Sequence, residues 1–337
     1  MEMALYYPEL GYYSSSRPRV GEKGDFYTSA YLTGLFGELL ARQLEEMWQA
    51  LGRGPFTVIE YGAGSGLLCR DILSRLRGNR LLYEKLNYFI IEKSGAMRER
   101  ERLLLPEKVE WKESIGEVGG VTGCIFSNEL LDNFSVHRVV MQDELKEVYV
   151  SYDGDFVEAL RPAPEVLKEY LVSLGVQLPT DYCAEINLEA TRWIQEVGEA
   201  LKRGWVMTID YGYPADTLYS KRSGTLACYH RHRVHSSPYE FIGEQDITSH
   251  VNFSALDHWG RRKGLEVGGF VNQTRFLQGL GLVNRLRDQE ENGMGEAEGR
   301  QLRTLLMEMG LKFKVLIQRK GIGKVFLSGL LFSDLLG

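Results

Sequence analysis

The sequence of 337 residues contains only four cysteines, and no two of them stand in a CxxC or another metal-ligand spacing. A disulfide framework is therefore not expected, and this cysteine use fits a reducing compartment. Positive charge is not in excess either, since the formal net charge is -6. A mildly acidic chain is a poor candidate for binding nucleic acid, which requires neutralisation of phosphates.

Long hydrophobic runs and export signals are also missing. No apolar run approaches the roughly 20 residues of a membrane span, and residues 1–10 do not show a basic segment followed by an apolar one. We therefore expect a soluble cytoplasmic protein with no membrane span, no nucleic-acid partner and no metal site. Hydrophobic residues make up 44% of the chain, which is enough apolar material for a core. The sequence leaves the oligomeric state open.

Strand-like and helix-like stretches alternate in the first half of the chain. A helical pattern covers residues 32–51, and further helical spacing covers 67–76 and the residues from about Ser94 onward. Short β-rich runs stand between and after them, at residues 56–61, 88–92, 109–111 and 121–126. This alternation predicts an α/β fold built on a doubly wound parallel sheet.

The alternation breaks after residue 134. A hairpin, a helix, a further helix and a buried strand are predicted in turn, at residues 136–152, 166–174, 188–201 and 205–210. In the tail we expect helices near 253–263 and 274–280, a strand near Val267, a disordered loop at 289–299, and a closing hairpin of residues 313–318 with 325–331.

These elements suggest a division into three parts. Residues 1–55 are expected to form an N-terminal lid and a helix. Residues 56–134 and 186–337 are expected to form a Rossmann-like domain with a C-terminal α+β extension. Residues 135–185 are expected to form an inserted hairpin and helix on the substrate side of the sheet.

The central motif is a glycine loop between strand and helix, Glu60-Tyr61-Gly62-Ala63-Gly64-Ser65-Gly66. Glycines let the backbone approach a ligand closely, and the loop lies at the carboxyl end of a strand, where open α/β sheets bind ligands. A nicotinamide-binding fingerprint would need a glycine where Leu67 stands. The observed spacing instead resembles the first motif of Rossmann-like S-adenosylmethionine (SAM) methyltransferases. The alternative is a glycine turn that only packs a helix on the sheet.

Glu92 supplies the second cofactor contact in this interpretation. It ends the next strand, and a carboxylate there can accept hydrogen bonds from both ribose hydroxyls. The predicted SAM-binding residues are Glu60, Gly62, Gly64, Gly66, Glu92, Ser94 and Asn128, with Asp25, Phe26 and Thr28 from a lid at residues 24–28. The alternative for the lid is a simple surface turn.

The fourth strand ends in Ser127-Asn128-Glu129-Leu130-Leu131-Asp132-Asn133, which in this fold class faces the transferable methyl group. Glu129 and Asp132 flank an apolar pair, and buried acids need partners. A cationic substrate group such as guanidinium would supply one. The alternative is a helix N-cap, with Asp132 and Asn133 capping and Glu129 exposed.

Further motifs extend these observations over most of the chain. The chain resembles the MidA family of SAM-dependent methyltransferases in Gly11-Tyr12-Tyr13, in residues 24–29, 36–38, 59–66 and 127–132, and in Ile209-Asp210-Tyr211-Gly212, residues 243–248 and Val251-Asn252-Phe253. It departs from the family at Ala63, where proline is frequent. It also departs at Leu130, Leu131 and Asn133, where two aromatics and an alanine are frequent.

The resemblance implies methyl transfer from SAM to an arginine of a protein partner. For the mitochondrial member this is symmetric dimethylation of a subunit of respiratory complex I, the NADH dehydrogenase. Guanidinium is protonated at neutral pH, and carboxylates can orient it for attack. Glu129 matches the first such carboxylate of arginine methyltransferases, Glu185 is the candidate second, and His250 is a candidate wall residue or proton acceptor, with a structural histidine as alternative. A small-molecule or other-residue methyltransferase and a SAM-binding assembly chaperone are the rival functions.

Overall fold

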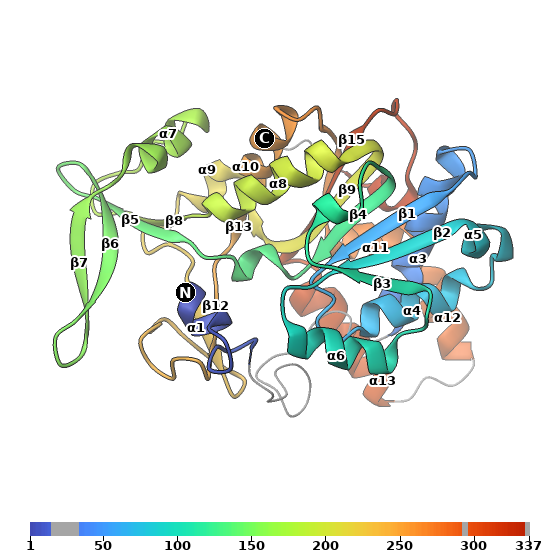
Figure 1. The fold of residues 1–337 in the computed structure, drawn as a ribbon, viewed down its shortest axis with the longest axis horizontal. Helices are drawn as coiled ribbons and strands as arrows, with labels where there is room; N and C mark the ends of the chain where they lie inside the picture. The colour runs from blue at the N-terminus through green and yellow to red at the C-terminus, as the bar shows by residue number, and fades with distance from the viewer. Residues whose placement is uncertain (15–33, 292–295, 334–337) are drawn as a thin grey trace.

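A mixed eight-stranded sheet forms the centre of the computed structural model, which describes residues 1–14, 34–291 and 296–333 (Figure 1). Neighbouring strands follow the order β14-β15-β9-β4-β1-β2-β3, and β13 pairs with β9 off this path. The strands from β3 to β9 are mutually parallel, whereas β15 is antiparallel to both of its neighbours. Their bounds are β1 Phe56–Tyr61, β2 Leu86–Ile91, β3 Val109–Lys112, β4 Val121–Asn128, β9 Leu201–Tyr213, β13 Val251–Asn252, β14 Glu266–Asn272 and β15 Phe313–Lys320.

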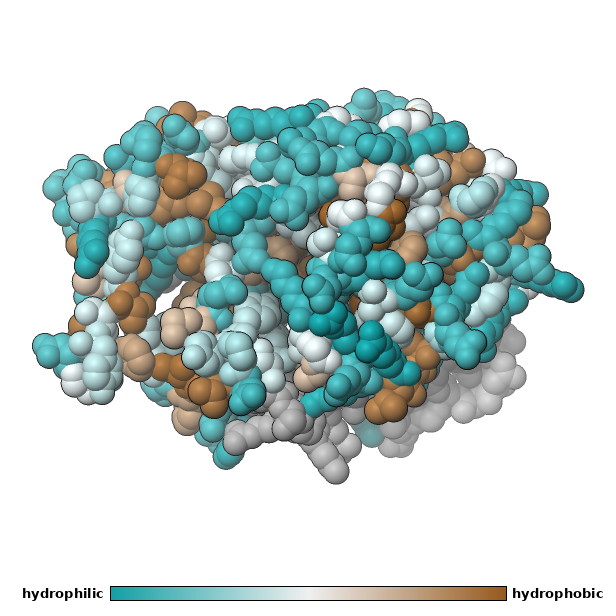
Figure 2. Space-filling model, viewed as in Figure 1, coloured by the Kyte–Doolittle hydropathy of each residue, from teal (hydrophilic) through white to brown (hydrophobic). Residues whose placement is uncertain are grey.

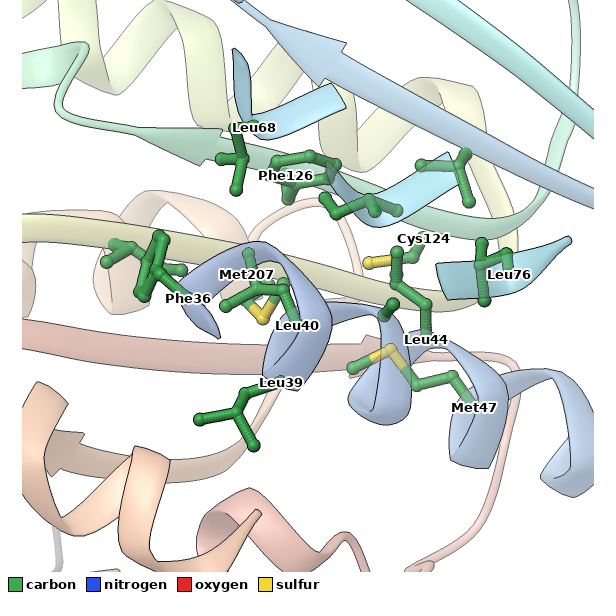
Figure 3. Close-up of a cluster of buried hydrophobic side chains, with 14 of the residues drawn as sticks. Phe36, Leu39, Leu40, Leu44, Met47, Leu68, Leu76, Cys124, Phe126 and Met207 are labelled. Carbon is green, nitrogen blue, oxygen red and sulfur yellow. The ribbon is translucent and has the colours of Figure 1, made fainter. Parts of the chain in front are cut away.

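Helices cover both faces of the sheet because the side chains of its strands alternate between two apolar cores. Along β4, Cys124 and Phe126 belong to one core and Ile125 to the other. The first core is completed by α3 (Gly34–Ala50), α4 (Leu67–Leu76) and α11 (Gln273–Gly279), and the second by α8 (Leu188–Ala200) and α10 (Phe253–Arg261). Figure 3 shows side chains of α3 packed beside those of β4 in the first core.

The order of the strands creates a switch point between β1 and β4. From β1 the chain proceeds through β2 to β3 at one side, and from β4 it proceeds to β9 on the other. Ligands bind outside the carboxyl ends of the strands at such a point. In the β1–β4 register Tyr61 lies opposite Ser127, so the glycine loop and Asn128 emerge side by side.

Two smaller sheets extend the molecule. The first has the order β7-β6-β5-β8 and carries α7; it projects at the left of Figure 1. The second has the order β11-β10-β12, and Leu5 and Tyr12 of the N-terminal segment pack on its Cys228 and Ile247. The bounds are β5 His137–Met141, β6 Leu145–Tyr152, β7 Phe156–Pro162, α7 Glu165–Ser173, β8 Cys183–Ile186, β10 Ala227–His230, β11 Arg233–His235, β12 Asp246–Thr248 and α1 Glu2–Tyr6.

The remaining elements are short. The α-helices are α5 (Arg80–Lys85), α6 (Gly95–Leu104), α9 (Ala215–Leu218), α12 (Leu282–Glu291) and α13 (Glu296–Arg303), the 3-10 turns are η1 (Ile115–Glu117), η2 (Leu131–Asn133) and η4 (Ser328–Leu330), and η3 (Thr304–Met309) is a π-helix. Of the helices in the described ranges, none has both the length and the apolar content needed to cross a bilayer.

The α/β fold with a Rossmann-like sheet is confirmed, but two predictions for the tail are wrong. The closing hairpin does not form, because β15 is already hydrogen-bonded on both sides, to β9 and to β14. The disordered loop expected at 289–299 is helical at both ends, in α12 and α13; its residues 292–295 lie outside the described part of the chain. The insertion at 135–185 contains the expected hairpin and helix, together with two strands that were not predicted, β7 and β8.

Candidate active site

A large cavity opens at the carboxyl edge of the central sheet, beside the switch point. Its volume is about 1260 Å³, and segments that are far apart in the sequence line it. They include the glycine loop after β1, the residues after β2 and β4, and parts of α8, β9, β12 and the N-terminal segment. Nine acidic but only four basic side chains line the cavity, so it favours a positively charged occupant.

The glycine loop, residues 62–66, places backbone on the cavity wall. Gly62, Gly64 and Gly66 have φ values of 66°, 57° and 75°, which glycine adopts without strain. A Cβ built on Gly64 would meet no atom within 4 Å, so the space beside this glycine is open. Gly62 and Gly64 line the cavity, whereas Gly66 does not and stands as the N-cap of α4.

Glu60 lies near the end of β1, just before this loop, and a hydrogen bond holds its side chain in place. Its carboxylate is buried and accepts a hydrogen bond from the Tyr88 hydroxyl, with 2.6 Å between Oη and Oε2. Burial raises the pKa of Glu60 to about 7, against the opposing effect of that hydrogen bond. Glu60 also lines the cavity.

Glu92 and Ser94 lie on the cavity wall directly after β2. The Ser94 N–H donates to Oε1 of Glu92 over 2.7 Å, which fixes the position of the carboxylate. Burial raises the pKa of Glu92, and hydrogen bonds from the backbone partly oppose this shift. The Ser94 hydroxyl caps α6 by accepting from Met97 N at 3.3 Å.

Asn128 and Glu129 form the end of the fourth strand, as the sequence predicted. Asn128 Nδ2 donates to Glu129 Oε1 over 3.2 Å, while its Oδ1 is buried and has no hydrogen-bond partner within the described residues. Glu129 has a φ of 53°, a left-handed value that is strained for a residue with a Cβ. Its N–H donates to the carbonyl of Ile209 at 2.9 Å, which holds this turn against β9. Both side chains line the cavity.

Asp132 lies in η2 and reaches the same cavity. Burial raises the pKa of its carboxyl well above the usual range, and the neighbouring acids Asp210, Asp246 and Glu129 add to the shift. Asp132 therefore lies among carboxylates, and it does not act as the helix cap considered as the alternative, since η2 has no side-chain cap hydrogen bond.

Asp210, on β9, anchors the turn that carries Glu129. Its Oδ2 accepts from the N–H groups of Leu130 and Leu131 at 3.2 and 2.9 Å, and its Oδ1 accepts from Tyr211 N at 2.9 Å. Burial raises the pKa of Asp210 to about 7, although these N–H groups favour the charged form. Asp210 was not among the predicted site residues, although it shares the feature that identified Glu92, an acid at the end of a predicted buried strand.

Further cavity residues that the sequence did not predict come from distant segments. Tyr13, Trp193, Tyr211 and Asp246 line the cavity. Three of them stand in stretches shared with the MidA family, and that was the only indication of their place. Their positions depend on packing between distant segments, so no local pattern identifies them.

The structure does not bring Glu185 or His250 to the cavity lining. The Glu185 carboxylate, on β8, accepts from the Thr225 N–H at 2.7 Å and from its hydroxyl at 2.9 Å; burial raises its pKa. The His250 ring lies 5.0 Å from the Tyr211 ring, centroid to centroid, and burial and the positive charge of Lys221 lower its pKa to about 4.

The predicted lid residues Asp25, Phe26 and Thr28 lie outside the described residues. Within the described ranges, no group of three or more His, Cys, Asp or Glu side chains is arranged to hold a metal ion.

A glycine loop after the first strand, an acid after the second and a polar end on the fourth define a SAM-dependent methyltransferase. The open space beside Gly64 and the unpaired Oδ1 of Asn128 fit this cofactor. The chain belongs to the Methyltransf_28 family of S-adenosyl-L-methionine-dependent methyltransferases, whose model matches residues 39–271. This match confirms the resemblance to the MidA family.

Known proteins agree with this assignment. The chain is 27% identical to "Protein arginine methyltransferase NDUFAF7 homolog, mitochondrial" of Drosophila melanogaster, over 96% of this chain and 80% of that protein. It is 25% identical to "Protein arginine methyltransferase NDUFAF7, mitochondrial" of Homo sapiens, over 85% and 70% respectively. A crystal structure from Burkholderia thailandensis, bound to S-adenosyl-homocysteine, matches with a TM-score of 0.89 and 32% identity, over 99% of this chain and 89% of that chain.

Proposed function

We propose that this enzyme transfers the methyl group of SAM to an arginine side chain of a protein substrate. The observation that carries the proposal is the placement of Glu129. A strained backbone holds its carboxylate on the wall of an acidic cavity, at the strand end where this fold class presents the methyl group. The names of the relatives, which describe protein arginine methyltransferases, agree with it.

The residues divide into a cofactor side and a substrate side. SAM supplies a methyl group on a positively charged sulfonium. We assign Gly62 and Gly64 to backbone contacts with the cofactor, Glu92 to its ribose hydroxyls, and Asn128 to a polar group of the ligand through the unpaired Oδ1. Glu60 and Ser94 hold these segments in place.

On the substrate side, Glu129 binds the guanidinium group of the target arginine. A carboxylate next to guanidinium accepts charge-assisted hydrogen bonds and fixes the plane of the group. The nitrogen that is to be methylated is then oriented toward the methyl group, and this positioning lowers the barrier to transfer.

The resemblance to the MidA family suggests a finer assignment, which we also propose. The substrate is a subunit of a respiratory NADH dehydrogenase, and the product is symmetric dimethylarginine. That the protein is located in the cytoplasm remains a prediction, which rests on its cysteine content.

Labelling the substrate tests this function. The purified protein is incubated with radiolabelled SAM and a cell lysate, and mass spectrometry locates the label; a Gly64→Val variant serves as the blank. Label on an arginine supports the proposal. Label on another residue or on a small molecule indicates one of the rival enzymes. Absence of label from a protein that still binds SAM indicates an assembly chaperone.

A further inference from the structure

Two buried carboxylates lie in the cavity beyond Glu129. Asp132 comes from η2 and Asp246 from β12, and their exposed fractions are only 4% and 3%. Both line the cavity, so neither is buried inside a closed core. Asp246 Oδ1 accepts from the Tyr13 hydroxyl and from Asn133 Nδ2, each at 3.0 Å, which fixes its orientation.

Asp132 lacks the cationic partner that stabilises a buried carboxylate. Its Oδ1 is buried without a hydrogen bond, and the carboxylate makes no ion pair within residues 1–14, 34–291 and 296–333. An unpaired polar atom buried in this way is destabilising until a ligand supplies its hydrogen bond. The nearby Asp210 is different, because backbone N–H groups saturate its carboxylate. The cavity therefore holds one oriented acid and one acid with a free acceptor.

Aromatic rings stand around these acids. Tyr13, Tyr211 and Tyr229 line the same cavity, and the Tyr211 hydroxyl donates to Thr248 Oγ1. Aromatic faces attract cations, and a planar guanidinium also stacks on rings. Burial and neighbouring acids raise the pKa of Asp132, and a cation next to its carboxyl would oppose that shift.

We propose that Asp132 and Asp246, with the rings of Tyr13, Tyr211 and Tyr229, form a cation-binding pocket that receives the guanidinium end of the substrate together with Glu129. This inference rests on the proposed function and assigns the second carboxylate that arginine recognition needs. It places that role at Asp132 and Asp246 rather than at Glu185, which does not line the cavity and whose Oε2 accepts from Thr225.

The chemistry of guanidinium fits this arrangement. The group carries five N–H donors in one plane, so acceptors on different elements can bind different edges of it. Asp132 follows Glu129 by three residues and lies in η2, whereas Asp246 lies in β12, in the sheet of β11, β10 and β12. A compact ammonium group would not use several edges in this way.

The test measures binding of two neutral-capped, nearly isosteric probes, Nα-acetyl-arginine amide and Nα-acetyl-citrulline amide, which differ in charge and in the replacement of one NH2 donor by a carbonyl acceptor. Affinities are measured by calorimetry with S-adenosyl-homocysteine present. We expect the wild type to prefer the arginine probe. Asp132→Asn should reduce arginine affinity at least about 10-fold while leaving citrulline and S-adenosyl-homocysteine affinity unchanged. Asp246→Asn provides the same measurement if Asp132→Asn does not fold.

Glu101→Gln is the matched control. Glu101 is also buried with one unpaired carboxyl oxygen, but it does not line the cavity, so its loss should leave the preference intact. The pocket is refuted if a folded Asp132→Asn protein keeps the wild-type preference, or if it loses S-adenosyl-homocysteine affinity in parallel. If arginine is labelled in the lysate experiment but neither variant changes the preference, the pocket fails and the proposed function stands. If the wild type neither labels nor prefers arginine, both fail.

Discussion

Gly64 combines a left-handed backbone with open space where a Cβ would point, and it lines the cavity. We predict that Gly64→Val abolishes measurable SAM binding, because the branched side chain fills the space that the ligand needs. Calorimetry checks this. Gly175→Val is the matched control, since Gly175 has a φ of 66° and equally open surroundings away from the cavity. Backbone strain of roughly 1–2 kcal/mol is then common to both variants. Equal SAM affinity in Gly64→Val and wild type would disprove the loop assignment.

The proposed contact between Glu92 and the ribose of SAM can be tested by substitution. Glu92→Ala should weaken SAM binding by roughly 1.5–3 kcal/mol, the range for hydrogen bonds to a charged group. The melting temperature without ligand should change little, because the hydrogen bonds to this carboxylate come from the adjacent backbone, at Lys93 and Ser94. Glu110→Ala, an exposed acid on the neighbouring β3, should bind SAM normally. Unchanged affinity in Glu92→Ala would contradict the ribose assignment.

At the scale of the element, Glu101 links α6 to β3 and makes the stability pH-dependent. Its Oε2 accepts from Trp111 Nε1 at 2.6 Å, and burial raises its pKa to about 8. Between the unfolded pKa near 4.5 and about 8, the folded state binds more protons than the unfolded state at this position. The contribution of Glu101 to stability therefore falls as pH rises through this window, with a slope of at most about 1.4 kcal/mol per pH unit.

The corresponding prediction uses Glu101→Gln, which has no titrating carboxyl. Relative to the wild type, its free energy of unfolding should increase between pH 5 and pH 8. Urea unfolding at both pH values measures the difference. A difference between the two proteins that stays constant over this range would mean that Glu101 titrates normally.

Elements with a clear local hydrophobic pattern could be predicted from the sequence, whereas β7, with seven residues, and β8 could not. The bounds of β1 and α4 agree with their predictions residue for residue. The missed β8 has four residues, and its partner β5 is distant in sequence. Such a strand forms because of tertiary pairing, which local propensity does not contain. The prediction of a hairpin in the tail was wrong for the same reason, since the partners of β15 in the sheet are β9 and β14.

At the scale of the whole molecule, the hairpin of β6 and β7 projects from the body and exposes apolar side chains. Val150 is 54% and Tyr152 69% exposed, and β7 lies at the edge of its sheet. Figure 2 shows a largely hydrophilic face on which hydrophobic residues are scattered. That residues 135–185 lie on the substrate side remains a prediction.

Shortening the hairpin tests that prediction. Residues 150–158 are replaced by Asn-Gly, which joins the paired residues Tyr149 and Ala159 through a two-residue turn. SAM affinity should be unchanged, while methylation of the protein substrate should fall by about 10-fold or more, as expected when exposed anchor residues are lost. The double variant Val150→Ser/Tyr152→Ser keeps the backbone intact and should also lower methylation of the protein substrate. Full methylation by both variants would place the docking surface elsewhere.

The site was predictable where its residues follow strands directly. The glycine loop, Glu92 and Glu129 all lie on one cavity, as their positions at strand ends implied. Asp132 was a candidate from the sequence, whereas Asp246 and Tyr13 were not predictable, because they reach the cavity only when distant segments pack together. Glu185 was chosen on a local motif, and its strand β8 carries it away from the cavity lining.

The most direct test of the central claim, that this site methylates arginine with Glu129 as its guanidinium ligand, is Glu129→Gln. SAM affinity and the rate of methyl transfer are measured on one preparation. Glutamine keeps the shape and removes the charge, so SAM should bind normally while the rate falls roughly 10²-fold or more. Parallel loss of binding and rate would make Glu129 a cofactor or structural residue. An unchanged rate would contradict the account.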